Sequence, residues 1–262
     1  MDLKDRYGPW ALLVGGSEGM GEHLARKLGK AGINIILVAR KSGALAQTAK
    51  IVRDESGVEV RTLPLDIGRN DMLERIREMT DGLDIGFLAH NVGGGASFGP
   101  FVDNTLEAAL TPVRTNCVAL TKLAHHFGKP MAERGRGGIL IIGSIAGNAG
   151  AYFIAGYSAA KAFNQILAEA LWAELQPRGV HVLCVPVGSA DTPSRRRSGT
   201  VDRDGLIVAK PEDVAQSALD QMPDGPVYVS PAEQDFFASL NIPARKQAAE
   251  LQRDLLLQMM PR

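Results

Sequence analysis

Short apolar runs alternate along the chain with segments whose apolar residues recur at helical spacing. An apolar run bounded by glycine or polar residues predicts a buried strand, and helical spacing predicts an amphipathic helix. Strands are predicted over residues 10–14, 33–38, 58–63, 85–89, 139–142 and 180–185. Helices are predicted over residues 23–31, 42–56, 71–80, 106–131, 156–175 and 211–222. This alternation predicts an α/β fold, in which a doubly wound parallel sheet is flanked by helices on both faces.

The remaining segments are expected to complete one domain over residues 1–262. Pro112 is expected to break or kink its helix, because proline lacks an amide hydrogen. A last short strand is predicted over residues 227–229. Residues 193–210 are polar and aperiodic, which is typical of a substrate lid. Apolar residues at i, i+4 spacing predict an amphipathic tail over residues 242–260, packed on a neighbouring subunit, on the lid or in the core.

Composition and charge exclude several classes of partner. Of the 262 residues, 45% are hydrophobic, and the formal net charge is zero. Because the chain has no basic stripe or polybasic cluster, we expect neither nucleic acid nor a membrane as a partner. Cys117 and Cys184 lie in apolar surroundings and are expected to be buried free thiols in a reducing compartment. With no signal peptide and no apolar run of membrane-spanning length, we expect a cytoplasmic protein.

A glycine-rich turn joins the first predicted strand to the first predicted helix. The turn contains Gly15, Ser17, Glu18, Gly19, Met20 and Gly21. Gly15 allows a tight turn, Gly19 leaves room for a pyrophosphate at the helix N-terminus, and Gly21 lets helix and strand pack closely. This context favours a dinucleotide site, although an ordinary glycine-rich loop has the same composition.

The residues after the second predicted strand favour NADP(H). They lie about 20 residues beyond the last glycine, where a dinucleotide fold binds the adenosine ribose. Ala39 replaces the acidic residue that would accept from a free 2′-hydroxyl, and Arg40 and Lys41 suit a 2′-phosphate. Glu18 would repel that phosphate unless Arg40 relieves the repulsion, either by pairing with Glu18 or by lying across the adenine face. Asp66 either accepts from the adenine amino group or caps the next helix.

Tyr157 and Lys161 form a candidate catalytic pair, because they stand one turn apart on the same face of the predicted helix. The ammonium is expected to lower the pKa of Tyr157 from about 10, so that the phenol exchanges a proton with a substrate oxygen. Ser144 follows a buried strand, and its hydroxyl is expected to hold the same oxygen. Asn116 either satisfies buried backbone groups or holds a water against Lys161. His90 is expected to be structural, because Tyr157 already supplies the acid.

These motifs lie along the chain in a fixed order. They are Gly15-x-x-x-Gly19-x-Gly21, Asp66, Asn91-Val92-Gly93, Asn116, Ser144, Tyr157-x-x-x-Lys161, and Gly188 with Thr192. In this order they resemble the short-chain dehydrogenase/reductase family across nearly the whole chain. The resemblance implies a single Rossmann-like domain, hydride transfer between a nicotinamide and a carbonyl or alcohol, and a homodimer or homotetramer.

The resemblance also implies roles for individual residues. Tyr157 would be the general acid/base and Ser144 would hold the substrate oxygen. Lys161 would bind the nicotinamide ribose, and Asn116 would support a water-mediated proton relay. Cofactor contacts would come from Gly15, Ser17, Glu18, Gly19, Met20, Gly21, Arg40, Lys41, Asp66, Ile67, Asn91, Val92, Gly93, Tyr157, Lys161, Val187, Gly188, Ala190 and Thr192. No metal ligand is predicted.

The leading hypothesis is an NADP(H)-dependent oxidoreductase acting on a ketone or secondary alcohol. The segment 7–10, the Ser17–Gly19 turn and Arg40 are similar to a bacterial subgroup that includes hydroxysteroid dehydrogenases, which favours a bulky hydrophobic substrate. One alternative is a 3-oxoacyl-thioester reductase, which predicts a basic patch near the lid such as 195–197. Another is a dinucleotide-sensing protein without catalysis, which would have no need of this set of catalytic residues.

Overall fold

The computed structural model contains one six-stranded parallel sheet with the strand order β3-β2-β1-β4-β5-β6. The structure describes residues 2–93, 98–151, 153–197 and 207–239. The strands are β1 (Trp10–Val14), β2 (Asn34–Ala39), β3 (Val60–Pro64), β4 (Ile85–His90), β5 (Gly137–Ile142) and β6 (Val180–Val185). Each of the six strands predicted for the sheet is therefore confirmed to within a few residues.

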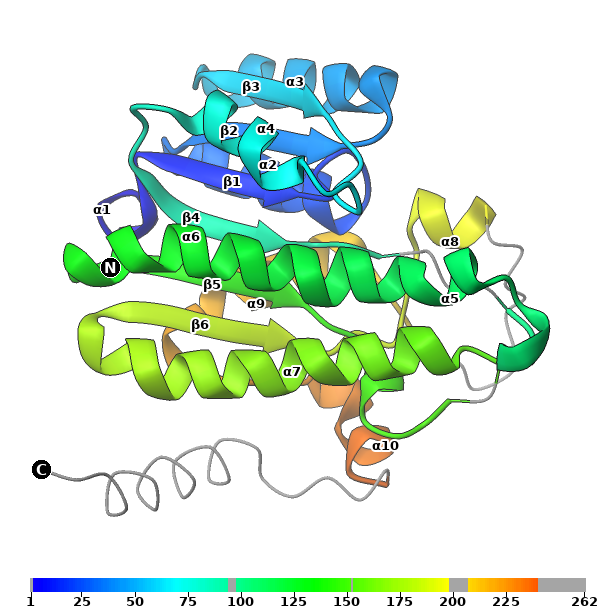
Figure 1. Ribbon diagram of the computed structural model, residues 1–262. Helices are drawn as coiled ribbons and strands as arrows, with labels where there is room; N and C mark the ends of the chain where they lie inside the picture. Colours follow the sequence, from blue (N-terminus) through cyan, green and yellow to red (C-terminus); the bar gives the residue numbers. More distant parts are fainter. Residues whose placement is uncertain (1, 94–97, 152, 198–206, 240–262) are drawn as a thin grey trace, which may run out of the picture.

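Helices cover both faces of the sheet (Figure 1). One face carries α2 (Met20–Lys30), α3 (Ser42–Ser56) and α9 (Pro211–Asp220). The other carries α4 (Met72–Thr80), α6 (Ala119–Glu133) and α7 (Ala155–Leu175). Shorter elements are α1 (Leu3–Tyr7), α5 (Leu106–Pro112), α8 (Pro193–Arg197), α10 (Gln234–Ser239), β7 (Ser189–Ala190) and β8 (Val208–Ala209).

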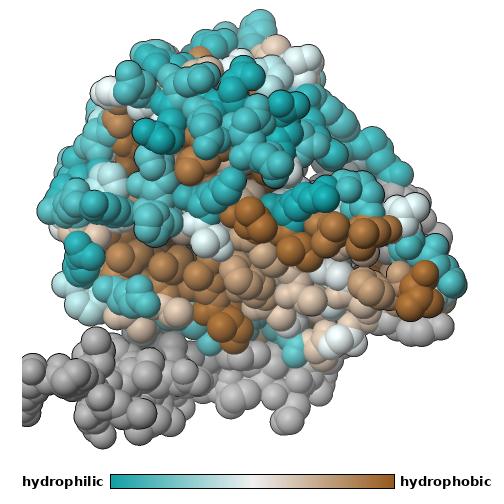
Figure 2. All heavy atoms as spheres, in the orientation of Figure 1, coloured by the Kyte–Doolittle hydropathy of each residue, from teal (hydrophilic) through white to brown (hydrophobic). Residues whose placement is uncertain are grey.

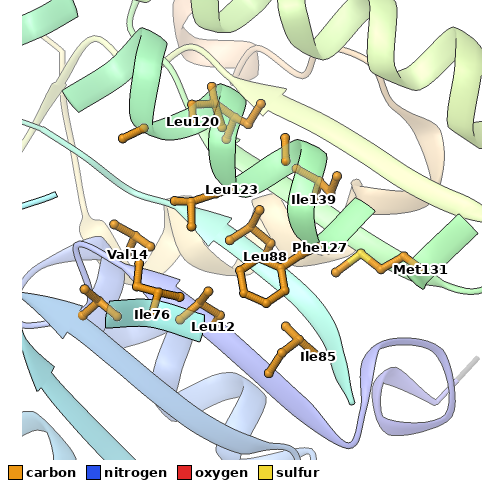
Figure 3. Packing of buried hydrophobic residues seen from close by; sticks show 14 of the residues in the cluster. Leu12, Val14, Ile76, Ile85, Leu88, Leu120, Leu123, Phe127, Met131 and Ile139 are labelled. Carbon is orange, nitrogen blue, oxygen red and sulfur yellow. The ribbon is translucent and has the colours of Figure 1, made fainter. Parts of the chain in front are cut away.

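The core lies on both sides of the strands, as expected for a parallel sheet. Leu12 and Leu88 face α6, where Figure 3 shows them close to Leu123 and Phe127. Phe87, the neighbour of Leu88 in β4, belongs to the second cluster on the opposite face. Burial on both faces holds the strands rigidly, so their carboxyl ends form a fixed platform for polar side chains.

The helix containing Pro112 does not break. It continues from α5 through a π-helical segment, Val113–Val118, into α6, and Figure 1 shows one rod across the sheet. The amide of Ala119 donates to the carbonyl of Arg114, which is the wider spacing of a π-helix. The rod therefore passes Pro112 without breaking, although its hydrogen bonding changes in the segment that follows.

The strand predicted over 227–229 is not formed. Val227 makes a single parallel bridge to Cys184, flanked by hydrogen bonds from Cys184 to Pro226 and from Tyr228 to Cys184. Pro226 has no amide hydrogen to extend the ladder, which explains why the pairing stops there. The predicted tail, 242–260, lies outside the described residues, as does the part of the predicted lid over 198–206.

The order of strands creates a crevice at the carboxyl edge of the sheet. From β1 the chain adds β2 and β3 on one side, and it then returns to add β4, β5 and β6 on the other side. Ligands of doubly wound sheets bind where the strand order reverses, which here lies between β1 and β4. Across the described ranges, no helix combines the length and the apolar composition needed to cross a bilayer.

Candidate active site

The glycine-rich turn lies at the reversal point and is packed too closely for side chains. A Cβ on Gly15 would lie 2.0 Å from the carbonyl oxygen of Asn91, and one on Gly21 would lie 2.1 Å from the carbonyl oxygen of Gly15. Asn91 closes the turn from β4, because its Nδ2 donates to the carbonyl of Gly15 at 2.8 Å. The backbone around the reversal point is therefore fixed by contacts that only glycine permits.

The N-terminus of α2 is suited to an anion. Gly19 occupies the cap position with φ 58°, and no described side chain caps the helix there. The first amides of α2 are therefore left for another acceptor, and the helix dipole favours a negative one. A helix start whose cap position is a glycine, with no capping side chain among the described residues, fits the pyrophosphate of a dinucleotide.

Glu18 pairs with Arg197 of α8 and not with Arg40, contrary to one expectation for the turn. The Nη1 of Arg197 donates to Oε2 of Glu18 at 3.1 Å, and a second hydrogen bond joins Nη2 to Oε1. Arg40 and Lys41 are exposed at the end of β2 and the start of α3. The charge of Glu18 is thus balanced by a residue of the predicted lid.

Asp66 does not cap the following helix. Its Oδ1 accepts from the amide of Gly68 at 2.9 Å in a local turn, and α4 begins six residues further on, after Asp71. Asp66 is exposed beside the buried Ile67, at the end of the strand next to β2. The side chain therefore remains available to a ligand at this edge.

Tyr157, Lys161 and Ser144 come together at the carboxyl end of β5. Ser144 lies two residues beyond the end of β5, and its hydroxyl forms a hydrogen bond with the phenol of Tyr157. The Nζ of Lys161 lies 5.7 Å from the centre of the Tyr157 ring. Lys161 is almost fully buried, and its Nζ donates to the carbonyls of Val92 at 2.9 Å and Ile142 at 3.0 Å. The three side chains predicted from the sequence are therefore adjacent in space.

The pKa of Tyr157 is shifted in the direction opposite to the one predicted. Burial raises the pKa, and the hydrogen bond with Ser144 offsets part of that increase. Burial also lowers the pKa of Lys161 to about 8. An ammonium that is itself desolvated and bound to two carbonyls does not outweigh the cost of burying a phenolate.

Asn116 is buried in the π-helical segment and linked to α7. Its Nδ2 donates to Oγ1 of Thr115 at 3.1 Å. The Asn164 amide, with its nitrogen turned toward the backbone, donates to the carbonyls of Asn116 at 2.7 Å and Ala160 at 3.2 Å. Asn164 is fully buried, and it was not predicted as part of the site. It ties the π-helical segment to the helix that carries Tyr157 and Lys161.

His90 lies beneath the same cluster at the end of β4. The side chain is completely buried, and neither ring nitrogen has a hydrogen-bond partner among the described residues. Burial lowers the pKa of His90 to about 3, helped by the Lys161 ammonium, whereas the nearby carbonyl of Thr115 acts in the opposite direction. His90 is therefore a neutral imidazole beside a buried cation.

The loop between Ser144 and Tyr157 is held against α7 by two small residues. A Cβ on Gly147 would lie 2.6 Å from the carbonyl carbon of Lys161, so only glycine allows this approach. Ser158 bonds to the carbonyl of Ala146 and accepts from the amide of Ala151 at 3.1 Å. Ser158 was not predicted, although its position directly after Tyr157 was a signal for it.

The segment after β6 reaches from the catalytic serine to the glycine-rich turn. The amide of Ile145 donates to the carbonyl of Val187 at 3.2 Å, beside Ser144. At the other end, Thr192 lies 2.9 Å from the position of a Cβ on Gly19. Ala190 between them is buried and pairs with Ala209 in the small β7–β8 sheet. The segment therefore spans the predicted cofactor crevice.

A small pocket adjoins Tyr157. Its lining residues are Gly99, Phe101, Asn104, Ala108, Ala109, Pro112, Phe153, Ile154, Ala155, Gly156 and Tyr157. Apart from Asn104 and the phenol, these side chains are apolar. Further large apolar residues, Phe98, Val102 and Leu106, are exposed nearby in the sequence. The phenol thus borders a space that is lined, among the described residues, by uncharged side chains.

The family model of the short chain dehydrogenases matches residues 9–202. The chain belongs to the short-chain dehydrogenase family. It is 32% identical over 223 residues to a 7beta-hydroxysteroid dehydrogenase of Clostridium sardiniense, covering 85% of each chain. It is 33% identical over 220 residues to a very-long-chain 3-oxoacyl-CoA reductase of Neurospora crassa, covering 82% of this chain and 64% of that one.

Solved structures of this family have the same fold. A structure from a study of 7beta-hydroxysteroid dehydrogenase stereoselectivity has a TM-score of 0.86 at 25% identity, covering 97% of this chain and 100% of that chain. A short-chain dehydrogenase of Sphingobium yanoikuyae in complex with NADPH has a TM-score of 0.79 at 31% identity, covering 97% of each. The protein is therefore a short-chain dehydrogenase in both sequence and fold, and an oxidoreductase by family.

Proposed function

We propose that this short-chain dehydrogenase transfers a hydride between NADP(H) and a bulky hydrophobic ketone or secondary alcohol, with hydroxysteroids as the leading substrate class. The observation that carries the proposal is the Tyr157 phenol, hydrogen-bonded to Ser144, at the border of a pocket whose described side chains are uncharged and mostly apolar. This arrangement puts a proton donor where an apolar substrate can present its one polar oxygen.

In this mechanism the nicotinamide, when bound, supplies or accepts the hydride. Tyr157 donates a proton to the carbonyl oxygen during reduction and takes it back during oxidation, while Ser144 holds that oxygen. A phenol already keeps its proton at neutral pH, so Tyr157 can act as the acid in reduction, and the burial that raises its pKa makes it a weaker acid. Lys161 has three donor hydrogens, and the two carbonyl contacts leave one for a ribose hydroxyl. Asn116 would hold a water through which a proton from solvent returns to the phenolate of Tyr157.

The preference for NADP(H) rests on the end of β2. Ala39 offers no carboxylate to a free 2′-hydroxyl, and Arg40 and Lys41 offer two exposed cations to a 2′-phosphate. The pairing of Glu18 with Arg197 supports the same preference, because it balances the carboxylate that would oppose the phosphate. The relative from Sphingobium yanoikuyae, crystallised with NADPH, gives the proposal independent support.

The residues that line the pocket favour a ketone substrate over a thioester that is carried on a nucleotide or a protein. Among the residues that the structure describes, no charged side chain lines the pocket. The basic patch that a thioester reductase would need is also partly neutralised, because Arg196 pairs with Asp191 and Arg197 pairs with Glu18. A 3-oxoacyl-thioester reductase remains the second candidate, since a relative with that activity covers most of this chain.

The proposal is tested by following nicotinamide absorbance with NADPH and NADH against steroid, aliphatic and thioester ketones. We expect turnover with NADPH and a bulky ketone. Tyr157→Phe should reduce kcat by at least about a hundred-fold, the scale of a lost general acid, while NADPH binding stays measurable. Full activity in this variant would reject Tyr157 as the acid, and preferential turnover of a thioester would favour the second candidate. Binding of NADPH without turnover of any ketone would favour a sensing protein.

We also infer that the protein forms a homodimer or homotetramer through α5 and α7. Figure 2 shows apolar side chains gathered in a band over the face that carries α5, α6 and α7. Exposed large apolar residues on this face include Val113 and Val118 of the π-helical segment and Phe163 and Ile166 of α7. Light scattering of the purified protein tests this assembly.

The two free thiols, one of them fully buried, support a reducing compartment such as the cytoplasm.

A further inference from the structure

Glu233 is a buried carboxylate outside the predicted site. It lies in the turn Pro231–Glu233 and is only 6% exposed. Its Oε1 accepts a hydrogen bond from the amide of Gly188 at 2.9 Å. Burying a carboxylate is costly unless hydrogen bonds compensate, and the burial raises the pKa of Glu233 while the Gly188 amide lowers it. The buried carboxylate of Glu233 is therefore held against one particular backbone amide, that of Gly188, although its burial costs free energy.

The contact with Gly188 leaves no room for any other residue. A Cβ on Gly188 would lie 2.2 Å from Oε1 of Glu233 and 3.4 Å from Cδ1 of Ile145. The amide of Ile145 in turn donates to the carbonyl of Val187. The single peptide unit between Val187 and Gly188 is thus held at both ends: its N–H donates to Glu233, and its carbonyl accepts from the amide of Ile145.

The position of this peptide unit determines the course of the chain across the crevice. From Gly188 the chain enters β7, and the amide of Asp191 donates to the carbonyl of Ala209 at 2.9 Å. It then reaches Thr192, which touches the glycine-rich turn at Gly19. A shift at Gly188 would therefore displace the backbone between the catalytic serine and the anion site of α2.

We propose that Glu233 is a positioning residue, which fixes Gly188 and the segment 187–192 in the conformation that binds the nicotinamide half of NADP(H). The inference rests on the proposed function. The carboxylate acts through the backbone amide and does not itself touch the reacting atoms. Its role requires an acceptor at the length of a glutamate side chain, so glutamine can replace it and aspartate or alanine cannot.

The experiment compares Glu233→Gln, Glu233→Ala and Glu233→Asp with the exposed neighbour Asp235→Asn as a control of equal charge change. The first measurement is the Kd for NADPH, from fluorescence titration without any ketone. The second is hydrogen exchange, without cofactor, in the peptide that contains Gly188. We expect alanine and aspartate to raise Kd by about ten-fold, the scale of a lost hydrogen bond to a charged group, and to speed exchange. Glutamine and the control should stay within about two-fold of the parent protein.

Unchanged Kd and exchange in folded Glu233→Ala would overturn the proposal, as would equal loss in the glutamine and alanine variants. If the alanine variant does not fold, the contrast between glutamine and aspartate decides the same question. A lower melting temperature with unchanged Kd would reduce Glu233 to a merely structural residue and would also overturn the proposal. Failure of the proposed function is distinguishable, because the parent protein itself would then neither bind NADPH nor reduce a ketone.

Discussion

Because His90 is buried, we expect the protein to lose free energy of unfolding in mild acid. In the folded protein burial lowers its pKa from 6.5 to about 3. Below pH 6.5 the unfolded chain therefore binds a proton that the folded protein does not bind, so acid favours unfolding. The free energy of unfolding is retained above pH 6.5, the pKa of His90 in the unfolded chain, and it declines as the pH falls towards the pKa of about 3 in the folded protein.

The size of the effect follows from the two pKa values. Between pH 7 and pH 5, a histidine that titrates at 6.5 when unfolded and far below 5 when folded costs about 2 kcal/mol of unfolding free energy. Because the folded pKa lies well below pH 5, this figure changes little if that pKa differs by one unit. The prediction therefore depends mainly on the complete burial of the ring.

Urea denaturation of the parent protein and of His90→Asn at pH 7 and pH 5 measures the effect. We expect the parent protein to lose about 2 kcal/mol more than the variant over this interval, with the same m-value. Other histidines with lowered pKa values, such as His181, contribute equally to both proteins and cancel in the difference. The smaller side chain of the variant can lower its stability at pH 7, but the test compares only the change in unfolding free energy between pH 7 and pH 5. Parallel pH dependences in the two proteins would refute the neutral, buried imidazole.

Two further substitutions test the cofactor site. Arg40→Asp should lower the ratio of kcat/KM with NADPH to that with NADH by more than about ten-fold, since it replaces a charge-assisted contact with repulsion; an unchanged ratio would discard that role. Gly21→Ala should lower both Tm and NADPH affinity, because its Cβ would lie 2.1 Å from the carbonyl oxygen of Gly15. The matched control is Gly43→Ala in α3, where a Cβ meets nothing within 4 Å and Tm should be unchanged or raised. Equal effects of the two alanine substitutions would contradict the steric argument.

The local features of this protein were available from the sequence. Apolar runs and helical spacing predicted the strands of the sheet and its principal helices, because each pattern reflects the burial of one segment. Helical geometry alone put Tyr157 and Lys161 on one face of α7. The glycines of the first turn could also be interpreted from the sequence, because a position that has no room for a side chain is occupied by glycine.

Other features depend on contacts between distant segments, and the sequence did not reveal them. Glu18 is paired with Arg197, 179 residues away, and Glu233 meets Gly188 across 45 residues. The direction of the Tyr157 pKa shift was predicted wrongly, because a neighbouring lysine is visible in the sequence but the depth of burial is not. Spacing along the chain determines which side chains share a helix face. Only the packed structure decides how much water they lose and which charges meet them, and these two quantities set the chemistry of the site.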